Sequence, residues 1–253
     1  MKQEFVKIQK IEEFQSGIFE LTFASKYISK NSKPGQFLNI RVDNSYQPFL
    51  RRPFSISNID EDSVKIIFNA IGQGTKKLIH KNINDELDVI GPLGNGFKYE
   101  ENTKTAFLIG GGLGIAPLPF LSKFLKDKTN IFTILGARTS NQIIRKDLFN
   151  FSVATDDGTE GFHGNVVDLA KKIISEKNIT PDVIYACGPT PMLKAIANFA
   201  NQNNIKCFAS WECEMACGIG LCQGCPIEFN DSNKKYHLVC KEGPVIETSK
   251  IKL

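Results

Sequence analysis

Four cysteines near the C-terminus have the spacing of iron–sulfur ligands. Cys217, Cys222 and Cys225 are separated by four and then two residues, and Cys240 follows after a further fourteen. The order C-x4-C-x2-C with a distant fourth cysteine is typical of the thiolates that hold a plant-type [2Fe–2S] cluster. Glycines stand between these cysteines, and they allow a tight loop whose backbone N–H groups can point at the cluster. The pattern therefore predicts a one-electron redox site in this segment.

Two other uses of the same cysteines are less favoured. Structural zinc sites generally combine two C-x2-C pairs, and this segment holds only one. A disulfide framework is typical of secreted chains, whereas this chain has an odd number of cysteines, seven, and nothing that resembles a secretory signal. We therefore expect reduced thiols and a cytoplasmic location.

The rest of the chain has room for two domains and a small module. It has 253 residues, of which 42% are hydrophobic and 23% charged, as in ordinary globular proteins. Its net charge of +4 is spread along the sequence, so we expect neither nucleic acid nor an anionic membrane as a partner. No apolar run reaches the roughly 18 residues that a membrane-spanning helix needs.

Residues 1–98 have the pattern of a small antiparallel barrel. Hydrophobic and polar residues alternate in short runs separated by turn residues, which favours β-strands. The expected strands lie at 1–10, 18–23, 37–42, 64–68 and 86–90, and residues 91–97 are expected to form a loop that closes the barrel.

Two motifs within the barrel could bind a phosphate-containing cofactor. Arg52 is followed at once by Pro53 and by a strand that contains Ser55, which can present a planar guanidinium and a hydroxyl together. Such a pair suits pyrophosphate or the edge of a flavin ring, although a surface arginine at a strand start explains the pattern equally well. Further along, a glycine turn with Gly74 and Thr75 opens an expected helix at 75–80, and N–H groups at a helix start attract anions.

From residue 103 the pattern changes to alternating strands and helices, which predicts a parallel sheet with helices on its faces. The expected strands lie at 106–109, 131–135, 151–155, 183–187 and 205–209, and the expected helices at 116–126, 165–176 and 191–202. Ligands bind at the carboxyl ends of such strands, which makes the turns that follow them candidates for a nucleotide site.

Two of these turns carry the nucleotide prediction. The first strand runs into a glycine-rich turn that resembles those of dinucleotide folds, formed by Gly110, Gly111, Gly112 and Gly114. The fourth strand ends in Cys187, Gly188 and Pro189, where a buried cysteine beside a turn is the alternative explanation. No acidic residue ends the second strand, which has Arg138 instead, so NADP stays open beside NAD.

These three parts, in this order, resemble the ferredoxin reductase superfamily. Within it, the chain is similar over nearly its whole length to the electron-transfer subunits of NAD-dependent dihydroorotate dehydrogenases. The motifs that carry the resemblance lie at 52–55, 74–75, 187–189, 215–225 and 240–245. The resemblance implies an N-terminal antiparallel β-barrel that binds FAD (1–100), a central parallel α/β domain that binds NAD (101–210) and a small C-terminal [2Fe–2S] module (211–253).

The same resemblance implies the site residues. It places the cluster on Cys217, Cys222, Cys225 and Cys240. It places FAD against Arg52, Pro53, Phe54, Ser55, Ile67, Phe68, Asn69, Gly74 and Thr75. It places NAD(H) against Gly110, Gly111, Gly112, Gly114, Cys187, Gly188 and Pro189. Phe54 stands where the wider superfamily has Tyr, and Asn69 where this group has Arg. No side chain is assigned a catalytic role.

The resemblance also implies a partner. Electrons would pass between the cluster and FMN in a separate dihydroorotate dehydrogenase catalytic subunit, within a heterotetramer of two subunits of each kind that serves pyrimidine biosynthesis. We expect Trp211, Met215 and Ile219 near that interface, and we interpret the additional thiol of Cys213 as a packing residue.

Two other functions stay open at this point. The first keeps the cofactors and changes the partner, as a subunit of a hydrogenase or of a ferredoxin:NADP oxidoreductase complex. The second is a non-enzymatic flavin-binding or zinc-binding protein that senses redox state. Absorbance and metal content of the purified protein separate the second function from the others.

Overall fold

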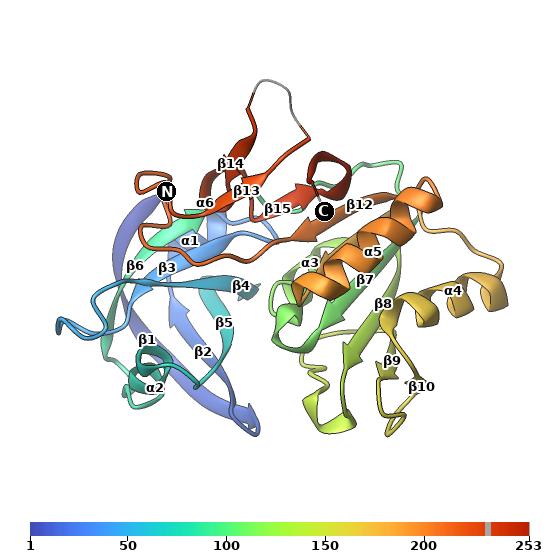
Figure 1. Cartoon of the computed structure of the whole chain (residues 1–253). Coiled ribbons are helices and arrows are strands. Elements are labelled where there is room, and N and C mark those ends of the chain that lie inside the picture. Colours follow the sequence, from blue (N-terminus) through green and yellow to red (C-terminus); the bar gives the residue numbers. More distant parts are fainter. Residues whose placement is uncertain (231–233, 253) are drawn as a thin grey trace.

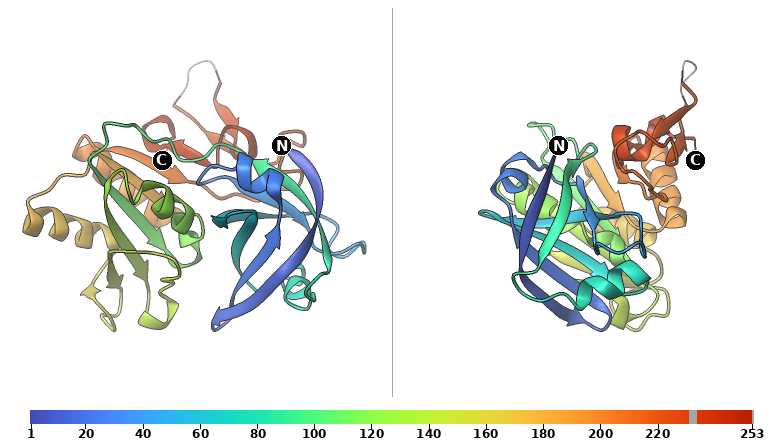
Figure 2. Two further views of the ribbon diagram at one scale, coloured as in Figure 1. Left: turned by 180° about the vertical axis from the view of Figure 1, so that it is seen from behind. Right: turned by 90° about the vertical axis from the view of Figure 1, so that its left-hand side faces the viewer.

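The computed structural model describes residues 1–230 and 234–252. A barrel formed by the first part of the chain lies beside a sheet formed by the middle part, and the C-terminal segment lies across the top of both (Figure 1). The view from behind in Figure 2 shows the same arrangement, with the C-terminal segment above the junction of barrel and sheet. Among the described residues, no helix is both long and apolar enough to cross a bilayer.

The predicted antiparallel barrel is confirmed, and it is closed and has six strands. Its inward-facing residues, such as Leu38 and Ile40, are fully buried, which follows from the alternation along each strand. The strands follow the order β1-β2-β5-β4-β3-β6 and span Lys2–Gln15 (β1), Ile18–Ala24 (β2), Phe37–Arg41 (β3), Arg52–Asp60 (β4), Ser63–Asn69 (β5) and Glu86–Leu93 (β6). The loop expected at 91–97 is wrong in its first three residues, because they continue β6 and pair with β1 and β3.

Two short helices, α1 (Lys26–Asn31) and α2 (Gln73–Ile79), connect strands of the barrel. Helix α2 begins two residues earlier than expected. The reason is a local cap, because Gly72 is extended and its N–H donates to the Thr75 hydroxyl at 3.2 Å. This cap fixes Gly74 and Thr75 in the first turn of the helix, beside the start of β4.

The middle of the chain forms a seven-stranded sheet in the order β10-β9-β8-β7-β11-β12-β15. The strands span Thr105–Gly111 (β7), Asn130–Ala137 (β8), Phe151–Thr155 (β9), Phe162–His163 (β10), Val183–Cys187 (β11), Lys206–Ser210 (β12) and Val245–Glu247 (β15). All neighbours are parallel except β12 and β15. The predicted parallel sheet is confirmed, but it has two edge strands that the sequence did not indicate. The chain order reverses between β7 and β11, where such sheets bind ligands.

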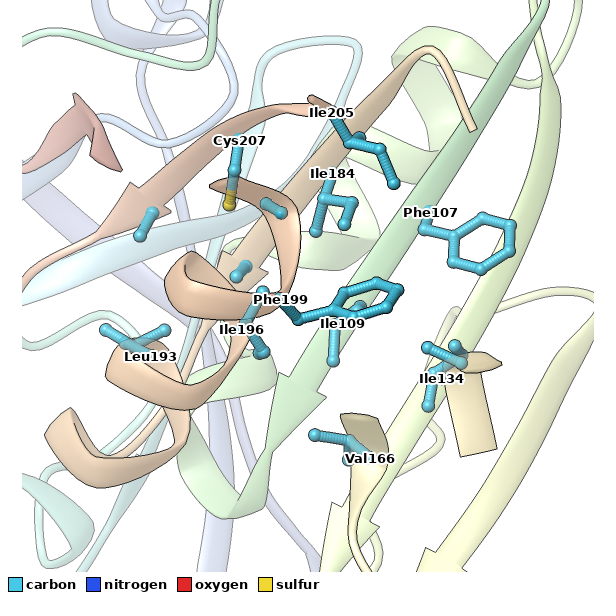
Figure 3. Packing of buried hydrophobic residues seen from close by; sticks show 14 of the residues in the cluster. Phe107, Ile109, Ile134, Val166, Ile184, Leu193, Ile196, Phe199, Ile205 and Cys207 are labelled. Carbon is cyan, nitrogen blue, oxygen red and sulfur yellow. The ribbon is translucent and has the colours of Figure 1, made fainter. Parts of the chain in front are cut away.

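Helices cover both faces of this sheet. Helices α4 (Val166–Lys177) and α5 (Thr190–Gln202) pack with Phe107, Ile109 and Ile184 on one face (Figure 3). Helix α3 (Leu118–Leu125) packs on the other face, between the sheet and the barrel. The predicted helices are confirmed with shifted ends. Asn165 caps α4 rather than starting it, since its side chain accepts two backbone N–H groups, and a 3-10 turn, Gly112–Ile115, precedes α3.

The C-terminal segment is attached to both domains. It contains the hairpin of β13 (Pro226–Glu228) and β14 (Tyr236–Leu238), helix α6 (Val239–Glu242), β15 and a final 3-10 turn, Thr248–Lys250. Trp211 is only 5% exposed and belongs to the hydrophobic core shared with α5. Its side chain is therefore covered within the chain, and the expectation that Trp211 lies near a partner interface stays a prediction.

Candidate redox site

One cavity brings together the residues predicted to bind the flavin. It has a volume of about 290 Å³ and lies where the barrel, the sheet and the C-terminal segment meet. Eight of the nine predicted flavin residues line it: Arg52, Pro53, Phe54, Ser55, Ile67, Phe68, Asn69 and Thr75. The ninth, Gly74, lies directly against Arg52, since a methyl group on Gly74 would be 3.2 Å from Arg52 Nε. The predicted residues thus form one site, on β4, β5 and α2.

Two adjacent arginines at the start of β4 have different environments. Arg51 lies outside the cavity and binds Asp88 on β6, with Nη2 2.5 Å from the carboxylate and Nη1 2.8 Å from the backbone carbonyl. Arg52 lines the cavity, and its Nη1 donates to the Leu50 carbonyl at 2.7 Å. The strand alternation sends one guanidinium to the barrel wall and the other to the site, so only Arg52 is available to a bound anion.

The two nucleotide loops pack directly against each other. Gly110 at the end of β7 is paired in register with Cys187 at the end of β11. A methyl group on Gly114 would lie 2.4 Å from Gly188 Cα, so the two backbones approach as closely as glycine permits. Both loops lie at the point where the strand order reverses. The structure therefore brings the predicted nucleotide residues together at the expected edge of the sheet.

Cys187 itself does not reach the edge of the site. Its side chain is 1% exposed, and burial raises the pKa of its thiol far above the ordinary value. A thiol in this position is neutral and inert. Of the two explanations that the sequence left open, a buried cysteine beside a turn describes this side chain, and any contact that Cys187 makes with a nucleotide uses its backbone.

The cluster loop is wrapped around its first cysteine. Cys217 Sγ accepts hydrogen bonds from the N–H groups of Ile219 at 3.5 Å and Cys222 at 3.4 Å. Burial alone would raise the pKa of Cys217, but these donors outweigh it and lower the pKa to about 6. Backbone donors aimed at a sulfur are the surroundings that an iron-bound thiolate needs.

The other three predicted cluster ligands differ in their exposure. Cys225 Sγ and Cys240 Sγ are 3.1 Å apart and buried, whereas Cys222 is exposed. Within the part of the chain that the structure describes, no three acidic, histidine or cysteine side chains converge on one point as a single metal ion requires. A [2Fe–2S] cluster is held by four thiolates, and four cysteines of one segment, with N–H donors at Cys217 and the close pair of Cys225 and Cys240, fit that group.

Sequence reasoning missed the residues that join the cavity to the cluster. Ser210, the last residue of β12, and Glu212, Cys213 and Met215, which follow the strand, all line the flavin cavity. Cys213 also packs against the hydrophobic group that contains Cys225 and Cys240, and burial raises the pKa of its thiol to about 12. The available signal was the carboxyl end of β12, because that end of every strand in such a sheet faces the ligand.

The fold and the site together define an electron-transfer protein of ferredoxin reductase-like fold. A ferredoxin-NADP+ reductase from Neisseria gonorrhoeae with bound FAD and NADP has the same fold, with a TM-score of 0.62 and 16% identity over 80% of this chain and 92% of that chain. An NADH-dependent reduced ferredoxin-NADP oxidoreductase is more similar, with a TM-score of 0.86 and 29% identity over 98% of this chain and 89% of that chain.

The chain belongs to the family of dihydroorotate dehydrogenase B (NAD(+)) electron transfer subunits. A member from Bacillus velezensis is 37% identical over the full length of both chains, and one from Fusobacterium nucleatum is 36% identical, also over both full lengths. Residues 212–252 match the model of the iron–sulfur cluster binding domain of dihydroorotate dehydrogenase B. The predicted family and the predicted iron–sulfur segment are confirmed, and the protein is an electron-transfer component of an oxidoreductase.

Proposed function

We propose that this protein relays electrons between NAD(H) and FMN in a dihydroorotate dehydrogenase catalytic subunit, through FAD and a [2Fe–2S] cluster of its own. The observation that carries the proposal is the shared cavity. Residues predicted to bind flavin line the same space as Leu113 of the glycine-rich turn and Cys213 beside the cluster loop. A flavin held there would meet the nucleotide on one side and the cluster segment on the other.

The cofactors divide the chemistry and the chain positions them. FAD, when bound, exchanges two electrons with NAD(H) and single electrons with an iron–sulfur cluster. Arg52 supplies a guanidinium for a phosphate or ring oxygen, and the apolar walls formed by Phe54 and Phe68, whose rings meet edge to face at 5.6 Å, exclude water. Leu113 of the glycine-rich turn lines the same cavity, so a nucleotide held by the two loops would lie beside the flavin.

The four cysteines 217, 222, 225 and 240 are the proposed cluster ligands. The N–H donors to Cys217 favour its thiolate form, and the close pair of Cys225 and Cys240 lies within the protein. Cys222 and its neighbour Leu221, which is 76% exposed, lie at the surface. This exposed edge is the side from which a partner's cofactor would approach the cluster.

The partner and the assembly belong to the same proposal. The relatives are named as electron transfer subunits, which implies a separate catalytic subunit. We propose that this subunit contains FMN and that two subunits of each kind form a heterotetramer in pyrimidine biosynthesis. We also propose a cytoplasmic location, because disulfides are rare there and reduced thiols persist, and we retain 1–100, 101–210 and 211–253 as the proposed domains.

The decisive experiment starts with protein purified without oxygen. Two irons, two acid-labile sulfides and one FAD per chain are expected. Addition of the FMN-containing partner and dihydroorotate should then reduce NAD⁺. Protein without iron and sulfide, even after reconstitution, would refute the cluster. Fully loaded protein that reduces NADP⁺ with ferredoxin but is inactive with dihydroorotate would favour the second candidate, which the similarity to the ferredoxin-NADP oxidoreductase supports.

A further inference from the structure

Asn39 is a buried amide on the outer wall of the barrel. Along β3 its neighbours Leu38 and Ile40 point into the barrel and are fully buried. The alternation therefore turns Asn39 outward, to the side that faces solvent in an isolated barrel. Asn39 is nevertheless only 1% exposed. The outer wall is covered here by the C-terminal segment, since Phe37, two residues along, packs with Cys225 and Cys240.

The Asn39 side chain contacts the cluster loop directly. Its Nδ2 donates to the backbone carbonyl of Cys217 at 2.9 Å. The next residue, Gly218, has a φ of +69°, and a methyl group on it would lie 2.6 Å from Asn39 Nδ2. The loop thus approaches the barrel as closely as a glycine allows, at the first of the four cysteines.

The backbone of Asn39 is connected to the flavin site. Its backbone is paired in register with Pro53, which lines the cavity, and its carbonyl accepts from Arg51 Nη1 at 3.5 Å. Its Oδ1 is buried and has no hydrogen-bond partner among the residues that the structure describes. A buried amide with one unpaired polar group is less stabilising at this position than an apolar side chain would be. Packing of the barrel therefore does not explain why an asparagine stands here.

We propose that Asn39 is the positioning residue that holds the first cysteine of the cluster loop against the flavin-binding wall of the barrel. This inference rests on the proposed cluster and flavin. Asn39 acts through the Cys217 backbone, and it fixes the distance from the cavity to the first thiolate. Loss of its N–H donor frees the loop at Cys217 while β3 and the cavity stay in place.

The test compares Asn39→Asp with Asn58→Asp in the full-length protein. Asn39→Asp keeps the shape and replaces the N–H donor with an oxygen that faces the Cys217 carbonyl. Asn58 is a matched control, because it is also a buried asparagine of the barrel, 7% exposed, but it donates to Asp147 in the α/β domain at 3.3 Å. Each variant is purified without oxygen and assayed for FAD, iron and sulfide.

Two rates are then measured. In Asn39→Asp we expect iron release to a chelator to become about threefold to tenfold faster, the factor that corresponds to one neutral hydrogen bond. We also expect slower reduction of the cluster after NADH is added, with flavin reduction unchanged. Asn58→Asp should leave iron release and cluster reduction as in the wild type. Asn39→Leu, which fills the wall without polar atoms, should resemble Asn39→Asp.

The possible outcomes distinguish failure of this inference from failure of the proposed function. Wild-type protein without a cluster refutes the proposed function. A loaded wild type with Asn39 variants that release iron and reduce the cluster at wild-type rates refutes the positioning role. Asn39 variants that lose flavin, cooperative unfolding and iron together also refute it, because Asn39 then serves barrel stability alone.

Discussion

Arg51 and Arg52 provide a sharp test of the site, because identical residues at neighbouring positions should have opposite effects. The Arg51 side chain is 19% exposed and that of its partner Asp88 is 10% exposed. Arg51→Ala removes two charge-assisted contacts to Asp88, each worth about 1.5–3 kcal/mol. Because part of that is regained from water, we expect the free energy of unfolding to fall by about 2–3 kcal/mol, with little effect on flavin affinity.

Arg52→Ala should have the opposite effects, a small loss of stability and a large loss of FAD affinity. Arg52 lines the cavity, and its internal contacts are hydrogen bonds to the carbonyls of Leu50 and Arg51. The first of these bonds is exposed and the second is long, at 3.3 Å, so water replaces them readily and we expect less than about 1 kcal/mol of lost stability. The loss of one charge-assisted contact to FAD should raise the dissociation constant of FAD by roughly tenfold to a hundredfold.

The assay uses flavin-free protein for both variants. Urea denaturation gives the free energy of unfolding, and titration with FAD gives the dissociation constant. The reasoning is refuted if Arg51→Ala loses flavin affinity with unchanged stability, or if Arg52→Ala binds FAD as tightly as the wild type. Either result would mean that the side chains of Arg51 and Arg52 point in other directions at the start of β4.

Three further predictions test the cluster, the nucleotide loops and the domain junction. Cys222→Ser should abolish electron delivery to the partner while NADH still reduces FAD in stopped-flow experiments; equal loss of both would mean a structural cluster. Gly114→Ala places a methyl group 2.4 Å from Gly188 Cα. The resulting overpacking, which costs about 1–3 kcal/mol, should displace the nucleotide loops and weaken NADH binding roughly tenfold. Gly72→Ala is the control, because open space surrounds Gly72, and this variant should bind NADH normally. At the junction, Glu20 on β2 is 3% exposed and lies 3.3 Å from Lys146 in the middle part of the chain. Burial raises the pKa of Glu20 above its ordinary value of 4.5, so the stability that its protonated form contributes is lost as the pH rises from 4.5 through the folded-state pKa. Glu20→Gln should remove this pH dependence of the free energy of unfolding; the same pH dependence in both proteins, measured by urea denaturation, would contradict it.

Much of the fold could be predicted because local patterns determine it. Alternating residues such as Leu38 and Ile40 are forced to one side of a strand whatever surrounds them. The glycine turn after β7 marks the edge where the sheet binds ligands, since strand polarity alone decides that edge. The flavin residues, which the family resemblance implied, line one cavity because they lie at the ends of paired strands and at one helix start.

Features that depend on contacts between distant segments could not be predicted from local patterns. Strand β15 is three residues long and exists because Val245 pairs with Ser210 on β12. Trp211 follows the end of β12, and the returning C-terminal segment covers its side chain, which no local pattern indicates. Asn39 looked like an ordinary outward-facing polar residue, and only the cluster loop makes it buried. Each case requires knowledge of which segment packs where.

Among the described residues, the C-terminal segment is attached to the rest of the chain at several points, and three of them bear on how the proposed relay would work. Its strand β15 extends the α/β sheet, the N–H of Asn95 after the barrel donates to the Gly243 carbonyl at 2.5 Å, and Asn39 of the barrel wall donates to the Cys217 carbonyl at 2.9 Å. A redox centre on a flexible tether would have no fixed distance to a flavin. Attachment to both domains fixes that distance and also ties the two domains together above the cavity. The cluster segment thus completes the flavin site that it is proposed to serve, which explains why its first residues line the same cavity as Arg52 and Ser55.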